Sequence, residues 1–266
     1  MRIAPDLHLP AVFQASLSIE RELWKKTLTT IEYQTLRGLH LFRSINLNAP
    51  WPLTFLRADA SFLNINQVET SASMRGHALT VTWRGSWGKW FSGMARYALS
   101  STKNDTSGPF ELPANNLDLR PEWGRADFDQ RHRSSLVGTV DLPKDLRFAT
   151  IVTVGSGVPY DITTGGDDNR DTVANERPPG LTRNTGDGPG LARCDLRVTK
   201  MFRVPRLLDR KRDHTSRNVE LSIDFFNVLN HTNFKGFIGA QTSPFFGRAN
   251  AAEAPRTIQF SARYRF

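Results

Sequence analysis

The chain has 266 residues, of which 39% are hydrophobic and 23% charged, and its formal net charge is +9. No run reaches the roughly 18 consecutive apolar residues that a transmembrane helix needs, which excludes a helical membrane protein. The single cysteine, Cys194, excludes an intrachain disulfide and a cysteine metal cluster. The basic residues are dispersed and match no nucleic-acid-binding module, so we expect no nucleic-acid partner.

Apolar and polar residues alternate along much of the chain, which is the period of a β-strand. About nine strands are predicted, and they meander through one all-β, antiparallel unit. Their ranges are 11–22, 26–38, 62–84, 88–102, 129–142, 146–160, 192–204, 217–229 and 256–266. The third range is long enough to be two strands broken near 73–76.

The final segment, 257–266, has the clearest alternation. Successive side chains of a strand point to opposite faces, so one face is apolar and the other polar and cationic. The apolar set is Ile258, Phe260, Ala262, Tyr264 and Phe266. This segment resembles the closing strand of a bacterial outer-membrane β-barrel. The resemblance makes Phe260, Tyr264 and Phe266 candidates for the signal read by the barrel-assembly machinery.

The connections between the predicted strands alternate in length. The short ones lie near 23–25, 85–87, 143–145 and 205–216, and the long ones near 39–61, 103–128, 161–191 and 230–255. Transmembrane barrels have short periplasmic turns and long outer loops, which favours a barrel. The basic segment 206–217 is longer than a tight turn and fits this scheme least well.

Tryptophans gather beside the first two short turns. They are Trp24, Trp83, Trp87 and Trp90. Amphipathic aromatic side chains are enriched where a membrane meets water, so these residues predict an interfacial belt at the turn end of the sheet. Aromatic residues in the core beside hairpins would give a similar pattern.

Several short motifs together resemble one family. They are Ser18–Leu23, Ile45–Pro50, Phe128–Arg133, Gly157–Tyr160, Asp167–Asp171, Glu176–Gly180, Arg183–Asn184, Phe225–His231, Ser243–Gly247 and Arg263–Phe266. Their order and spacing, from residue 11 onward, are similar to those of the C-terminal part of a TonB-dependent receptor barrel. The resemblance is to the Oar-like group, whose members carry a carboxypeptidase-regulatory-like domain at the amino end.

The resemblance implies an outer-membrane receptor for nutrient uptake, with a larger barrel, an internal plug and a segment that contacts TonB. Residues 1–266 would form the C-terminal portion of that barrel. A signal peptide, the plug and the TonB-contacting segment are not recognisable in the sequence, so a fragment is expected. Its partners would be outer-membrane lipid, the missing plug and N-terminal strands, and TonB only through the absent N-terminal part.

One loop has the spacing of a cation site. Asp167, Asn169 and Asp171 offer alternate side-chain oxygens, as at the start of a calcium loop, although Thr172 and Pro178 occupy the positions of its usual Gly and Glu. Ordinary turns favour the same residue types. Calcium is therefore the one cofactor that we consider, with no other expected.

Catalytic motifs are not recognisable. Gly155-Ser156-Gly157 is not a nucleophile elbow, and the histidines have no zinc spacing, so we expect no enzyme. Arginines such as Arg133, Arg197 and Arg265 are expected to line a polar lumen, either as anion-attracting groups or in charge pairs with Asp195, Glu220 and Asp224. The alternative fold is a soluble β-sandwich that binds a carbohydrate-type ligand through its loops.

Overall fold

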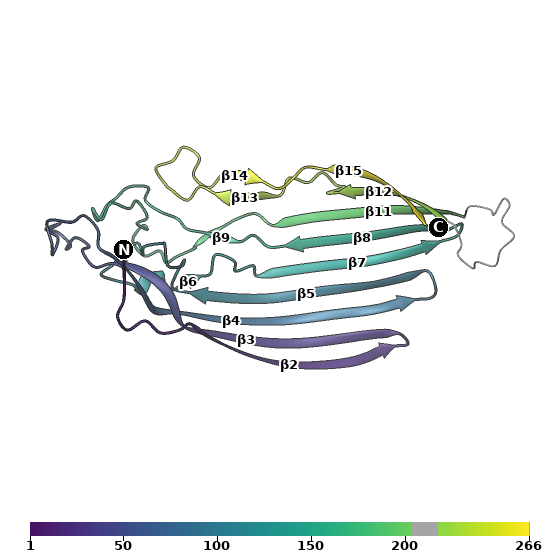
Figure 1. Ribbon diagram of the computed structural model, residues 1–266, viewed down its shortest axis with the longest axis horizontal. Coiled ribbons are helices and arrows are strands. Elements are labelled where there is room, and N and C mark those ends of the chain that lie inside the picture. Colours follow the sequence, from purple (N-terminus) through teal and green to yellow (C-terminus); the bar gives the residue numbers. More distant parts are fainter. Residues whose placement is uncertain (204–217, 266) are drawn as a thin grey trace.

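The computed structural model describes residues 1–203 and 218–265. In this part of the chain, nine long strands form one antiparallel meander in which each strand pairs with the next, with β2 and β15 at the edges (Figure 1). The nine are β2 (Ala11–Trp24), β3 (Thr27–Asn46), β4 (Asn66–Trp87), β5 (Phe91–Asn104), β7 (His132–Leu142), β8 (Leu146–Gly155), β11 (Leu191–Arg203), β12 (Asn218–Phe226) and β15 (Thr257–Arg265).

Shorter elements complete the described structure. The strand β1 (Arg2–Ile3) pairs parallel to β4, and β6 (Gly124–Arg125) extends the sheet beside β5. Two small sheets lie outside the meander. They are formed by β9 (Pro159–Tyr160) with β10 (Gly186–Asp187), and by β13 (Phe234–Phe237) with β14 (Ala249–Ala252). A single 3-10 turn, η1, covers Arg120–Glu122.

The nine predicted strands are confirmed in number and order, but several predicted bounds are wrong. The strand predicted for 146–160 ends at Gly155, and the one predicted from 62 begins at Asn66. The strand β3 continues to Asn46, so the predicted loop start at residue 39 is wrong. Its pairing with β4 is irregular between Gly38 and Arg43, and His40 has a φ of 55°. Such a bulge interrupts the two-residue period, which hides the continuation of the strand in the sequence. The possible break near 73–76 is also wrong, because β4 is one strand.

The register sorts the side chains of the sheet into two chemically different faces. Directly paired residues share a face, so one row can be followed across seven strands. On one face the row is Trp87, Phe91, Val140, Phe148, Val198, Ile223 and Phe260. One position along, on the other face, the row is Ser92, Thr139, Ala149, Arg197, Asp224 and Gln259.

The apolar face is not covered by a second layer. Leu17, Ile19 and Phe260 on this face are 71%, 68% and 75% exposed. Exposed apolar area of this extent marks a surface that meets lipid or a partner. The described part of the chain contains no helix of the length and hydropathy needed to cross a membrane, a finding that does not bear on a β-barrel.

The polar face carries ion pairs between neighbouring strands. Arg197 Nε donates to Asp224 Oδ1 over 2.5 Å, and Arg265 Nη2 lies 3.2 Å from Glu220 Oε2. Arg193 and Asp195 pair along β11 at 3.0 Å. The predicted charge pairs of Arg197 and Arg265 are therefore present, whereas Arg133 forms no ion pair within 4.0 Å of a described residue.

The two ends of the sheet differ in their connections, as predicted. Short turns join β2 to β3, β4 to β5 and β7 to β8 at one end, where the chain also finishes (Figure 1). Long connections gather at the opposite end, at 47–65, 105–131, 156–190 and 227–256. The predicted connection 205–216 lies outside the described residues. The long connections pack together as one group, called here the outer loop cluster.

Candidate functional site

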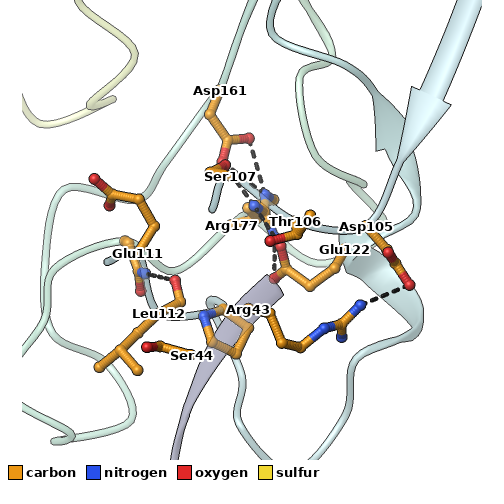
Figure 2. A pocket seen from close by; sticks show the side chains of 12 residues that line it. Arg43, Ser44, Asp105, Thr106, Ser107, Glu111, Leu112, Glu122, Asp161 and Arg177 are labelled. Carbon is orange, nitrogen blue, oxygen red and sulfur yellow. Dashed lines mark hydrogen bonds and ion pairs between the residues drawn. The ribbon is translucent and has the colours of Figure 1, made fainter. Parts of the chain in front are cut away.

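Arg177 forms the most buried ionic contact of the outer loop cluster. Its side chain is 7% exposed and donates hydrogen bonds to Asp161 over 2.8 and 2.9 Å and to Glu122 over 2.7 and 3.1 Å (Figure 2). Burial lowers the pKa of Arg177, but the hydrogen bonds to Asp161 and Glu122 outweigh it and raise the pKa above its usual range. Glu122 also accepts the backbone N–H of Ala114. Two long connections, 105–131 and 156–190, are thereby held together.

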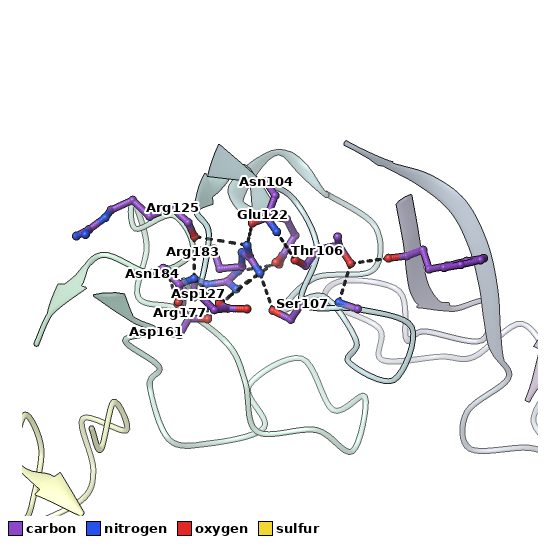
Figure 3. Close-up of polar contacts among 12 residues, drawn as sticks. Asn104, Thr106, Ser107, Glu122, Arg125, Asp127, Asp161, Arg177, Arg183 and Asn184 are labelled. Atoms are coloured by element: carbon purple, nitrogen blue, oxygen red, sulfur yellow. Dashed lines mark hydrogen bonds and ion pairs between the residues drawn. The ribbon is translucent and has the colours of Figure 1, made fainter. Parts of the chain in front are cut away.

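Arg183 forms a second buried centre (Figure 3). Its side chain is 2% exposed and donates to Ser107 Oγ over 2.6 Å and to the side-chain oxygen of Asn104. Asp127 lies 3.7 Å away. Burial lowers the pKa of Arg183, and the charge of Asp127 only partly offsets this effect. The position of the arginine is thus fixed mainly by neutral acceptors.

The segment of the predicted cation residues folds into a tight turn. Asp167 accepts the backbone N–H groups of Asp171 and Thr172 over 2.9 Å each. The side-chain Oδ1 of Asn169 also accepts the Asp171 N–H, over 2.8 Å, and the Asp171 carboxylate accepts from Val173 N–H and Asn116 Nδ2. The three residues are therefore close together, and part of their hydrogen-bonding capacity serves the turn.

Glu176 joins this group, which the sequence did not reveal. One carboxylate oxygen from each of Asp167, Asp171 and Glu176 lies within 4.8 Å of the other two. Asp171 is fully buried and Glu176 is 8% exposed. Burial raises the pKa of both Asp171 and Glu176, and the neighbouring acids raise it further. Glu176 stands within a Glu-Arg-Pro-Pro run without cation-loop spacing, so no motif identifies it.

The predicted assembly residues lie on the edge strand β15. Phe260 and Tyr264 belong to its apolar face and are 75% and 53% exposed, while Phe266 lies outside the described residues. Their placement leaves the apolar side chains of the last strand exposed, and β15 is an edge strand of the sheet. Recognition by the barrel-assembly machinery stays a prediction.

The predicted aromatic belt lies at the short-turn end of the sheet. Trp24, Trp87 and Trp90 are 69%, 75% and 53% exposed, and Trp83 stacks on Phe91 with ring centroids 6.5 Å apart. These exposed rings are placed where interfacial aromatic side chains of a barrel are expected.

A second aromatic set lies nearer the outer loop cluster and was missed in the sequence. The hydroxyl groups of Tyr33 and Tyr97 each form a 2.8 Å hydrogen bond with the Nδ1 atom of a histidine, His77 and His132 respectively. Both pairs join neighbouring strands on the apolar face. Only the register brings them together, because the partners are far apart in the sequence.

Comparison with known proteins agrees with this geometry. The family described as "Outer membrane beta barrel domain" matches residues 1–182 and 180–259. No curated protein matches. Among solved structures, the outer membrane transporter YddB from Escherichia coli is similar, with a TM-score of 0.65 and 14% identity over 97% of this chain and 33% of that one.

Two receptors share the same fold. The ferric-catecholate import receptor Fiu from E. coli K12 has a TM-score of 0.57 and 10% identity, over 97% of this chain and 28% of that one. The pyoverdine receptor FpvA from Pseudomonas aeruginosa PAO1 has a TM-score of 0.55 and 12% identity, over 98% and 30%. The chain thus spans about a third of the length of these structures. The predicted outer-membrane β-barrel fold is confirmed, and the chain belongs to the outer membrane β-barrel domain family.

Proposed function

We propose that this chain is the C-terminal portion of an Oar-like, TonB-dependent outer-membrane receptor that takes up a nutrient. In this proposal the plug and the remaining strands come from other parts of the receptor, which also supply the contact with TonB. The chain alone does not transport. Outer-membrane lipid contacts the apolar face of the sheet, and the plug contacts the polar face.

The open edges of the sheet carry this proposal. Along their described lengths β2 pairs only with β3, and β15 pairs only with β12. Each edge therefore presents a row of backbone N–H and C=O groups without a strand partner. In lipid such groups cost several kcal/mol each, so only a closed barrel is stable there. Additional strands between β15 and β2 would satisfy both edges at once.

The polar face supports a lumen that contains a plug. Its ion pairs, Arg197 with Asp224 and Arg265 with Glu220, leave a surface with both signs of charge. Such a surface suits contact with a polar, folded domain and with water. The absence of a covering second sheet over the apolar face, among the described residues, disfavours the soluble β-sandwich.

Export of the chain into the outer membrane tests the proposal. The chain is expressed with a cleavable signal peptide, and the outer-membrane fraction is examined for a band whose migration changes on heating. We expect aggregation and no heat-modifiable band from the chain alone, and a band when it is fused to the N-terminal strands of a similar receptor. A heat-modifiable, conducting barrel formed by the chain alone would contradict the proposal.

A further inference from the structure

We propose that Asp167, Asp171 and Glu176 bind one calcium ion inside the outer loop cluster. The three carboxylates come from a single loop, yet the side chains around them come from two other long connections. The inference concerns the architecture of the loops and does not depend on which solute the receptor transports.

The spacing of the oxygen atoms fits the ion. One oxygen from each carboxylate lies within 4.8 Å of the other two. Calcium takes oxygen ligands at about 2.3–2.6 Å, so two ligands on opposite sides of it are about 5 Å apart. A calcium ion between the three carboxylates would need little movement of the side chains, and water or backbone carbonyls can supply its remaining ligands.

Glu176 provides an independent indication of a missing ligand. It is 8% exposed, and neither of its buried carboxylate oxygens has a hydrogen-bond partner of normal geometry. A buried carboxylate without a partner is costly, and a cation removes that cost directly.

Nearby arginines do not neutralise the group, because they serve other partners. Arg177 pairs with Asp161 and Glu122, and the Arg170 guanidinium lies 4.1 Å from the centre of the Phe55 ring. The hydrogen bonds of Arg57 go to backbone carbonyls and to Asn64. No ion pair within 4.0 Å involves Asp167, Asp171 or Glu176 among the described residues.

The position of the group explains what the ion would do. Asn116 donates to the Asp171 carboxylate over 3.1 Å, and Asn64 donates to Thr172 Oγ1 over 2.8 Å. Asn175 donates to the Leu112 carbonyl over 2.9 Å. The calcium loop is therefore tied to the connections 47–65 and 105–131. A cavity of about 240 Å³, lined in part by Asp171 and Asn116, adjoins the group. Calcium would fix the shape of the outer loop cluster around it.

Calorimetry on the full chain tests the proposal. The full chain, fused to the N-terminal strands of a similar receptor, is refolded in calcium-free detergent micelles, its β-sheet content is measured by circular dichroism, and calcium is titrated in. We expect saturable binding with a Kd of about 10⁻⁴–10⁻³ M, as in other extracellular calcium sites. Magnesium should bind at least about tenfold more weakly, because it demands stricter geometry and keeps its water. No binding heat up to about 10 mM calcium would overturn the proposal.

Two substitutions distinguish a specific calcium ligand from a nonspecific effect of the negative charge of the loop. Glu176→Gln should weaken calcium binding about tenfold or more, since it removes one charged ligand without changing size. Asp168→Asn is the matched control: Asp168 lies in the same loop but outside the three-carboxylate group, and it accepts a hydrogen bond from Thr164. Unchanged binding in Glu176→Gln, or equal loss in Asp168→Asn, would overturn the assignment.

Thermal unfolding shows whether Glu176→Gln weakens calcium binding only because it destabilises the fold. In chelator, Glu176→Gln should unfold at the same or a higher temperature than the unchanged chain, because a buried unpaired charge is gone. In calcium, only the unchanged chain and Asp168→Asn should gain stability. A calcium-dependent gain of equal size in Glu176→Gln would contradict the role of Glu176 as a ligand.

Discussion

Arg177 and Glu122 are 55 positions apart in the sequence, yet Arg177 Nη1 donates to Glu122 Oε1 over 2.7 Å. Their side chains are 7% and 6% exposed. Two long connections are therefore joined by a buried ion pair at the end of the sheet where the loops gather. The loops form a packed cap whose stability can be measured separately from that of the strands.

Arg177→Met should loosen the outer loop cluster. Removing one member of a buried pair leaves the other charge unpaired and typically costs about 3–5 kcal/mol. We expect faster proteolytic cleavage within 105–131 and 156–190, with the strands unchanged in circular dichroism. Arg120→Met is the control, because its pair with Asp118 is solvent-exposed and should matter little. Equal cleavage of both variants would contradict the structural role of Arg177.

Asn48→Ala should unfold the connection 47–65. Asn48 is 1% exposed; its Nδ2 donates to the carbonyls of Asp59 and Phe62, and its Oδ1 accepts the Asp59 N–H. Each lost bond costs about 1 kcal/mol, and the carbonyls and the N–H are left without partners. Hydrogen exchange of this connection should rise sharply. Asn115→Ala, which removes one exposed turn bond to Leu117, should leave it unchanged.

Leu136→Arg and Val137→Arg should differ strongly in how well the protein inserts into lipid, although Leu136 and Val137 are both 39% exposed. Leu136 shares the apolar face with Ala95 and Val152, whereas Val137 shares the polar face with Met94 and Ile151. Arginine facing the middle of a bilayer costs about 2–4 kcal/mol in a barrel, but arginine facing the lumen does not. We expect only Leu136→Arg to reduce insertion into lipid vesicles as part of the fused barrel. Equal insertion would show that the apolar face does not meet lipid.

Cys194 reports directly on the orientation of β11. It pairs with Val152 on the apolar face, so in vesicles that contain the fused barrel it should react with a lipid-soluble maleimide and resist a charged one. Thr153→Cys in a Cys194→Ala background places the thiol on the polar face and should reverse the preference. Rapid labelling of Cys194 by the charged reagent would contradict the assignment of the two faces.

The sequence by itself determined the strands and their two faces, because alternation is a local property that each strand carries in its own residues. The rows through Phe260 and Ile223 follow from this period once neighbouring strands pair. The alternation also fails locally, at the bulge beside His40, where the period is interrupted and the end of β3 was misplaced. The short connections and the tryptophans beside them indicated which end of the sheet carries the turns and which carries the long loops.

Only the tertiary structure decided which side chains of the outer loop cluster contact one another. Arg177 meets Glu122, and Glu176 meets Asp167 and Asp171, through the folding of long connections whose residues have no periodic pattern. The Asp167–Asp171 spacing indicated a cation loop, but Glu176 is identified by burial and by the lack of a hydrogen-bond partner. Those properties depend on how several loops pack against one another, and no single segment of the sequence contains them.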